Sequence, residues 1–344
     1  MLLQRFGFIL SAICLFILAG CQQQSGRGDY GLSKQTRGKN VLFAVEFTQG
    51  QTIRYRLVSD RKSIIDFEQN AAKGKDSTMK VDERMELVVA YEAIDVDENG
   101  FAKIRARCES AGVTRDTAGK TSRRDAVESL AGKSFTFTIT PSGLIKDTTG
   151  MNSLIQQLVQ KAFASDGGGN IKDPEMILDF IALQWFMWDS ASSIPDPARG
   201  VSPGEKWDSK LLIPVPFPLR LARDVTYRLH EVRDVNDTIL ATIRSSYSVS
   251  DSVPDDWPRP YQGSFKMRGT FGFFYSMMGG FNIQSVTGTG RQIFNVDTGI
   301  LVEDNQDYVI EAIANRSLPL GGGSGTPKLT ITQKLSAQLL QNGN

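Results

Sequence analysis

Apolar residues recur at every second position along several stretches of the chain. Near the N-terminal end, Ile53, Tyr55 and Leu57 alternate with polar residues. A longer run is broken only at Glu83 and comprises Met79, Val81, Met85, Leu87, Val89 and Tyr91. The C-terminal stretch repeats the pattern at Leu329, Ile331, Leu335, Ala337 and Leu339. Alternation with a period of two is typical of strands with one buried face, so the chain is predicted to be predominantly antiparallel β.

In the middle of the chain, the apolar spacing changes to that of helices. The segment NSLIQQLVQKAFA, which begins at Asn152, has its apolar residues at the spacing of an amphipathic helix. After the glycines at 167–169, Asp173 can cap a second helix that has Pro174 in its first turn. That helix continues through EMILDFIALQWFMWD and has almost no polar face, so it must be covered on nearly every side.

Two segments of the chain resemble each other, and both are predicted to be β-hairpins. Tyr91–Ala106 and Tyr227–Ser245 share a tyrosine, a following valine, an acidic turn with asparagine, and then Ala-x-Ile-Arg. Tight two-residue turns are predicted at Asn99-Gly100 and at Asn236-Asp237, because these residues tolerate positive φ.

Shorter segments recur in the same order around the two hairpins. GQTI precedes the first hairpin as PGEKW precedes the second, and SGLI follows the first as TGIL follows the second. The simplest account is an α+β fold of two related β-rich halves with curved sheets and an intervening pair of apolar helices. We expect residues 41–165 to form the first half with a C-terminal helix, residues 166–200 an apolar helix and linker, and residues 201–344 the second half.

The first 20 residues have the layout of a signal peptide. Arg5 is the only charged side chain, and an apolar run from Phe6 to Ala19 is shorter than the roughly 20 residues that span a bilayer. The segment LAGC, which ends in Gly20 and Cys21, resembles the lipobox of bacterial lipoproteins. The resemblance implies cleavage between these two residues and a diacylglycerol on the Cys21 sulfur. The alternative is an ordinary secretory signal with a cysteine there by chance.

A polar segment follows the predicted cleavage site. Residues 21–40 consist mostly of Gln, Ser, Gly, Lys and Arg, which cannot bury enough apolar surface to fold, so they are predicted to be a flexible tether of about 25 Å. Gln22 follows the cysteine, where aspartate signals inner-membrane retention in some bacteria. We therefore expect a membrane partner reached through the N-terminal lipid, the folded part in the periplasm, and the outer membrane favoured over the inner.

Composition argues against several other functions. Lys and Arg number 39 against 38 Asp and Glu, so no strong field favours nucleic acid as a partner. Cys108 stays alone once Cys14 leaves with the signal and Cys21 is acylated, and its strand pattern predicts a buried thiol. The single histidine, His230, is predicted to be solvated and cannot supply a multi-histidine metal site. We predict no catalytic residue, no metal ligand and no cofactor.

Two stretches are candidates for binding an apolar ligand. The second helix is either ordinary core or a lid over a cavity, as in lipoprotein carriers whose half-barrel sheet is closed by helices. Its ligand-contacting residues would be Phe180, Trp185, Phe186 and Trp188. The tract GTFGFFYSMMGGFN, which includes Phe271 and Tyr275, is either a binding loop or a buried strand. Gly288-Thr289-Gly290 lacks the third glycine and following helix of a nucleotide loop, and the predicted strand residues Ile293 and Phe294 follow it instead.

From about Val41 to Leu340 the chain resembles a family of uncharacterised bacterial lipoproteins with a repeated β-rich domain of unknown function. The resemblance rests on the lipobox and on the segments GQTIRY, TPSGLIKD and SPGEKW, and it implies no catalytic residues. We expect a membrane-anchored, non-enzymatic binding or structural module, with an envelope protein or an apolar ligand as its further partner. The alternative is a carrier of lipid or another apolar ligand, and a carboxylate-dependent hydrolase ranks below both.

Overall fold

The computed structural model describes residues 40–67, 78–117, 124–163, 174–216, 220–257, 277–316 and 326–340. All of them belong to one compact unit. The predicted signal peptide, the lipidation site at Cys21 and nearly all of the predicted tether lie outside these ranges. Asp173 and the residues from Phe271 to Tyr275 also lie outside them.

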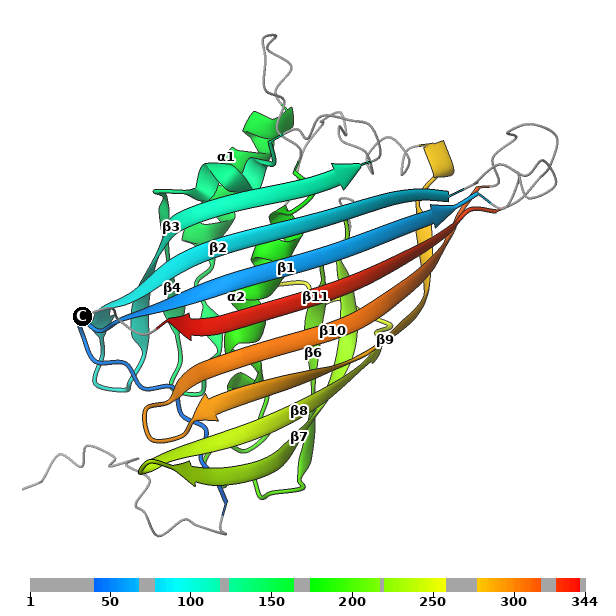
Figure 1. Cartoon of the computed structure of the whole chain (residues 1–344). Helices are drawn as coiled ribbons and strands as arrows, with labels where there is room; N and C mark the ends of the chain where they lie inside the picture. The colour runs from blue at the N-terminus through cyan, green and yellow to red at the C-terminus, as the bar shows by residue number, and fades with distance from the viewer. Residues whose placement is uncertain are drawn as a thin grey trace, which may run out of the picture. The chain divides into compact units, whose positions relative to one another are not determined.

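Every strand in these ranges belongs to one antiparallel sheet of eleven strands (Figure 1). The strand order across the sheet is β5-β4-β3-β2-β1-β11-β10-β9-β8-β7-β6. The strands are β1 Thr52–Asp66, β2 Thr78–Val96, β3 Ala102–Thr117, β4 Ser134–Ile139, β5 Ile145–Lys146, β6 Lys206–Ile213, β7 Leu221–Val235, β8 Thr238–Val249, β9 Phe281–Asn295, β10 Ile300–Ala314 and β11 Lys328–Leu340. The predominantly antiparallel β prediction is confirmed.

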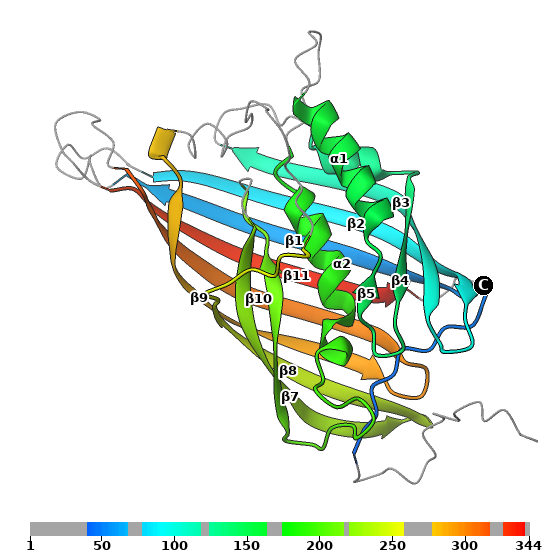
Figure 2. The same ribbon diagram turned by 180° about the vertical axis from the view of Figure 1, so that it is seen from behind.

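The strands of the two β-rich parts of the chain join into one sheet through a single strand pair. β1 pairs with β11 from Arg54 opposite Leu340 to Asp66 opposite Lys328. The sheet is open, because β5 and β6 are its edges. It curves around a central helix, and we call the face that this helix covers the inner face (Figure 2).

The central helix is α2, Ile177–Ser192, and thirteen of its sixteen residues are buried. The predicted cover on nearly every side is thereby confirmed. The predicted start at Pro174 is wrong by three residues. Met176 is the N-cap residue and makes no side-chain cap. Its backbone N–H instead donates to the Asp125 carboxylate at 3.2 Å, so a distant residue supplies the acceptor.

The other helical elements lie beside the first part of the sheet. Helix α1, Thr149–Phe163, corresponds to the predicted first helix. It packs on β4 and on the 3-10 helix η3, Ala126–Leu130. Asp125 caps η3 by accepting the Val127 N–H at 3.0 Å. This places a carboxylate at the point where η3 and the start of α2 meet.

The two predicted hairpins are both present, but their turns differ. Asn236 and Asp237 have φ of 53° and 61° and form a two-residue turn between β7 and β8, as predicted. The turn predicted at Asn99-Gly100 is longer, because the Asp97 side chain accepts the N–H groups of Asn99 and Phe101, both at 2.9 Å. The intervening loop therefore runs from residue 97 to residue 101.

The single-residue predictions for Cys108 and His230 are confirmed. Cys108 is buried on β3, and burial raises the pKa of its thiol to about 12. His230 is exposed on β7.

Residues 40–47, which we call the strap, pass from one edge of the sheet to the other. Val41, Phe43 and Val45 are buried. Val41 bridges to Val201, near the start of β6, and the Val45 N–H donates to the Pro141 carbonyl, between β4 and β5, at 2.8 Å. A Cβ on Gly299 would overlap the carbonyl oxygen of Ala44 in the strap. The strap is thus packed against turns from both parts of the chain.

Two glycines of β9 make room on the inner face. A Cβ on Gly288 would overlap the Asp307 carbonyl oxygen and the Tyr308 Cβ, and one on Gly290 would overlap the Tyr247 hydroxyl. The rings of Tyr247 and Tyr308 meet edge to face at 5.8 Å between centroids. The segment Gly288-Thr289-Gly290 lies within β9, and its glycines let tyrosines from the two neighbouring strands meet.

We expect Gly288→Ala to lower the free energy of unfolding by about 1–3 kcal/mol, because the added methyl group has no space in this packed site. Gly112→Ala in β3 is the matched control, since no atom lies within 4 Å of a Cβ there. Urea denaturation of both variants measures the difference. Equal losses would show that β9 is not packed in this way.

Candidate functional site

Three polar side chains recur at every fifth position of helix α2, and the first two are buried while the third is partly buried. They are Asp179, Gln184 and Asp189. Five residues turn an α-helix by about 140° beyond a full turn, so successive members of this set point toward different parts of the surrounding sheet. The set therefore holds the helix from three sides.

The three side chains accept hydrogen bonds from different strands. Asp179 accepts from Ser59 and Arg61 on β1 and from Gln333 on β11. The other two accept from tyrosines. Gln184 Oε1 is 2.7 Å from the hydroxyl of Tyr91 on β2, and Asp189 Oδ2 is 2.6 Å from the hydroxyl of Tyr227 on β7. Ser209 on β6 also donates to Asp189, at 2.9 Å. We call these contacts the seat of α2.

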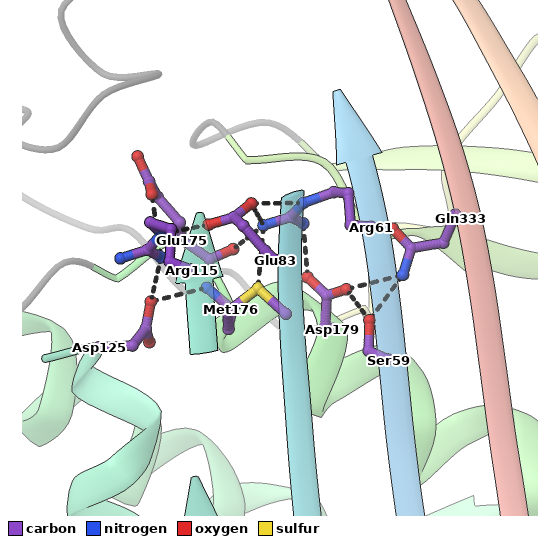
Figure 3. A network of polar contacts seen from close by, with 9 residues as sticks. All are labelled: Ser59, Arg61, Glu83, Arg115, Asp125, Glu175, Met176, Asp179 and Gln333. Carbon is purple, nitrogen blue, oxygen red and sulfur yellow. Dashed lines mark hydrogen bonds and ion pairs between the residues drawn. The ribbon is translucent and has the colours of Figure 1, made fainter. Parts of the chain in front are cut away.

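The densest part of the seat surrounds the guanidinium group of Arg61, whose side chain is fully buried (Figure 3). Its Nη1 donates to Asp179 Oδ2 at 2.7 Å, and its Nε and Nη2 donate to Glu83 Oε2 at 2.9 and 2.7 Å. Nη2 also lies 3.2 Å from the carbonyl oxygen of Glu175, just before α2 begins. Arg61 therefore joins β1 and β2 to the first turn of the helix.

A second guanidinium group extends this network toward η3 (Figure 3). Arg115 on β3 lies 2.6 Å from the other oxygen of Glu83 through Nε, and its Nη2 is 3.0 Å from both Asp125 and Glu175. Glu83 thus lies between two arginines. Asp125 and Glu175 connect the pair to η3 and to the segment before α2.

Charge is not balanced in this network. Arg61 and Arg115 face four carboxyl groups, those of Glu83, Asp125, Glu175 and Asp179. Full ionisation would leave excess negative charge in a buried place, which is costly. Protonation of one or more carboxyl groups relieves this cost.

The pKa directions follow from burial and from the arginines. Burial raises the pKa of Asp125 to about 7 against the opposing effect of Arg115, and it also raises the pKa of Asp179 against the effect of Arg61. For Glu83, burial acts to raise the pKa, but the two guanidinium groups outweigh it and the pKa is lowered. The network therefore keeps Glu83 ionised and can hold a proton near neutral pH.

A second polar cluster lies on the inner face nearer β7. The guanidinium carbon of Arg223 is 4.3 and 4.0 Å from the ring centroids of Tyr247 and Tyr308, and Arg223 donates to Gln306. Gln306 in turn donates to Asp304 at 3.3 Å. Burial raises the pKa of Asp304 to about 7, and it raises that of Asp189, at the far end of α2, to about 6.

Strand register lines up much of this polar chemistry in one row across the sheet. Arg115 lies opposite Glu83, Glu83 opposite Arg61, Arg61 opposite Gln333, and Gln333 opposite Tyr308. Sequence reasoning missed this row. Its signal was present, since Glu83 is the break in the alternation of β2, and Gln333 fills the gap between the apolar Ile331 and Leu335.

The residues predicted to contact an apolar ligand are mostly deep in the core. Phe180, Phe186 and Trp188 are at most 2% exposed, and Trp185 is partly buried. Phe180 packs edge to face on Phe135 at 5.9 Å, and Trp188 does so on Phe47 at 5.9 Å. The structure brings them to one helix inside the sheet, and their contact with a ligand stays a prediction. The predicted cleavage site at Gly20 and Cys21 is outside the described ranges.

A groove of about 470 Å³ is lined by residues of β1, β2, β3 and β11, among them Asp60, Lys62, Arg84 and Lys334. Two of these charged side chains pair with each other. Arg84 lies 2.6 Å from Asp60, and both side chains are more than 40% exposed. We assign no ligand to this groove, because exposed pairs of this kind are ordinary surface.

Within the ranges that the structure describes, no group of three or more His, Cys, Asp and Glu side chains could hold a metal ion. No helix in the same ranges combines the length and apolar character that crossing a membrane requires.

Comparison with known proteins yields no family. No protein-family model and no curated protein matches the chain. A structure of lipovitellin, described by its lipid–protein interactions, is 10% identical with a TM-score of 0.41, and the match covers 86% of this chain and 26% of that one. An outer membrane channel from Pseudomonas putida F1 is 6% identical with a TM-score of 0.19 and coverages of 87% and 98%. Pseudomonas aeruginosa OpdQ is 8% identical with a TM-score of 0.17 and coverages of 84% and 99%.

The chain spans about a quarter of the lipovitellin chain that it matches. All three TM-scores are too low to support an argument about this protein's fold or function.

We expect Asp125→Asn to change how stability depends on pH. The pKa of Asp125 is higher in the folded protein, about 7, than its ordinary value of 3.8, so the folded state binds the proton more tightly. This group's contribution is therefore fully present below about pH 4 and is lost as pH rises toward 7, by at most about 1.4 kcal/mol per pH unit. Asp125→Asn has no proton to release at this position, so it should lack this decrease in the free energy of unfolding.

Urea denaturation at pH 5, 6 and 7 measures the effect. The free energy of unfolding should fall more steeply with pH in the wild type than in Asp125→Asn. Glu98→Gln, in the exposed β2–β3 loop, controls for the removal of one negative charge. Parallel pH profiles for the wild type and Asp125→Asn would contradict proton binding at this carboxyl group.

Proposed function

We propose that this protein is a lipid-anchored, non-enzymatic binding module of the bacterial envelope. The observation that carries the proposal is the segment LAGC, which ends at Cys21 and is followed by a polar stretch up to residue 39. Asn40, the next residue, is held by the Arg199 carbonyl at 2.9 Å and by Ser202. A chain tethered at Cys21 would therefore reach the folded unit at the strap, on one end of the sheet.

The relation between the two β-rich parts supports the resemblance to repeat-containing lipoproteins. Strands β1 to β5 and strands β6 to β10 follow one another across the sheet in the same direction. The hairpin β2–β3 corresponds in this order to β7–β8, and the turn at Gly143 to the turn at Gly299, both with positive φ. We infer that the two parts arose by duplication. The last strand, β11, then joins them, because it lies between β1 and β10 in the sheet.

A second candidate function is transport or storage of an apolar ligand on the inner face. The arrangement of α2 favours it, because this apolar helix covers the centre of the inner face. An apolar ligand would take the place of part of the helix rather than fill a separate space. The aromatic residues Phe180, Phe186 and Trp188 would then line the ligand or move away from it.

The anchor is tested by intact-mass measurement of the protein extracted from bacterial membranes in mild detergent. We expect a mature chain that begins at Cys21 and carries the mass of a diacylglycerol and further acyl groups. Cys21→Ser should be recovered without lipid mass and should leave the membrane fraction. An unmodified wild-type chain in the soluble fraction would overturn the proposal.

Native mass spectrometry of the same preparation tests the carrier function separately. We expect an additional non-covalent mass in the range of a lipid, which Cys21→Ser retains because the inner face is unchanged. A chain without any bound apolar molecule, after expression in cells and after incubation with total lipid extract, would exclude the carrier and leave the anchor standing.

A further inference from the structure

We propose that Ser59, Arg61 and Gln333 form a binding site for the anionic head group of an amphiphile, and that Asp179 occupies this site in the structure. We call these three residues the cradle. The inference rests on the carrier function proposed above and names the class of its ligand: a molecule with an alkyl chain and a carboxylate or phosphate head.

The cradle has the geometry of a carboxylate receptor. Ser59 Oγ and Gln333 Nε2 both donate to one oxygen of Asp179, the latter at 3.0 Å, while Arg61 Nη1 donates to the other oxygen at 2.7 Å. Gln333 also donates to Ser59 Oγ at 2.6 Å, which orients both groups (Figure 3). All the donors come from the sheet, and the acceptor comes from the helix.

The sheet positions these donors without help from α2. Arg61 lies directly opposite Gln333 in the β1–β11 register, and Ser59 is two residues away on the same face of β1. Glu83 holds the opposite edge of the Arg61 guanidinium group through two hydrogen bonds. Arg61 is therefore oriented by the sheet, with Nη1 left for an anion.

The buried positive charge of the Arg61 guanidinium group requires an anion beside it. Burial acts to lower the pKa of Arg61, but Asp179 and Glu83 outweigh it and the pKa is raised, so the guanidinium group stays charged. If α2 moves away, Asp179 and Glu175 leave with it. The sheet keeps Arg61 and Glu83, but Arg61 Nη1 then lacks the carboxylate that it contacts in the structure. A ligand anion would take the place of that carboxylate.

The surroundings of the cradle select an apolar tail. On the same face, Leu57 and Ile331 are fully buried, and Leu335, which lies opposite Ser59, is 1% exposed. An alkyl chain lying along β1 and β11 would contact these side chains. An anion without an alkyl chain would leave these apolar side chains exposed.

The first test is chemical rescue of the cradle. Asp179→Ala should lower the unfolding midpoint, because it leaves Arg61 Nη1 and the Ser59 hydroxyl without their acceptor. Sodium acetate should restore part of that loss, and sodium chloride at the same ionic strength should not. Asp189→Ala is the control, since it removes a partly buried carboxylate of the same helix that is held by Tyr227 and Ser209 rather than by an arginine. Equal responses to acetate and chloride in Asp179→Ala would overturn the proposal.

The second test measures binding of dodecanoate, dodecyl phosphate and dodecanol, below their critical micelle concentrations, by isothermal titration calorimetry. We expect both anionic amphiphiles to bind Asp179→Ala at least about tenfold more tightly than the wild type, because the competing carboxylate is gone. Dodecanol should show no such gain. Comparison of dodecanoate with dodecyl phosphate shows which head group the cradle prefers.

Removal of the cradle should reverse the gain. In the Asp179→Ala background, Arg61→Met should weaken dodecanoate about tenfold or more and leave dodecanol unchanged. If that double variant does not fold, Gln333→Leu in the same background provides the test with a smaller expected loss. An equal gain for dodecanol and dodecanoate would overturn the cradle and leave the carrier function standing. Acetate rescue without binding of any amphiphile would overturn both.

Discussion

The buried charge of Arg61 is the constraint on which the arrangement of the core depends. Its side chain has no exposure, and it contacts carboxyl groups from β2 and from α2. Removing a single partner of such a group typically costs about 3–5 kcal/mol, because a charge is then left uncompensated in the core. The strands β1, β2 and β11 and the start of α2 must therefore come together for any one of these contacts to form well.

The helix at the centre of the sheet illustrates how polar contacts can define a position that apolar packing leaves open. Most of α2 is apolar on all sides, and such a helix could slide or rotate among similar side chains. Asp179, Gln184 and Asp189 remove that freedom, because each meets hydrogen-bond donors on different strands. The strap adds a further contact at the opposite end, where Phe47 packs on Trp188.

The same contacts link the fold to its proposed function. Helix α2 is held both by packed side chains and by these polar contacts, and in the proposed function a ligand anion would replace the contact that Asp179 makes with Arg61. The raised pKa values of Asp125, Asp179 and Asp189 make the seat sensitive to pH as well. The position of the helix and the protonation of these carboxyl groups are therefore coupled.

The local pattern of the sequence was sufficient for the strands, the turn at Asn236-Asp237, the burial of Cys108 and the full cover of α2, because each depends on neighbours within a few residues. It was not sufficient for the turn after β2, where the Asp97 side chain holds a longer loop, or for the start of α2, where the acceptor at Asp125 is 51 residues away. Nor could it show that β1 pairs with β11, since alternation indicates a buried face and not a partner strand.

The polar row was visible only as interruptions at positions such as Glu83 and Gln333, and an interruption alone fits a solvated residue or a bulge equally well. Tertiary structure decided between these, because only the strand register and the helix placed the opposite charges within hydrogen-bonding distance.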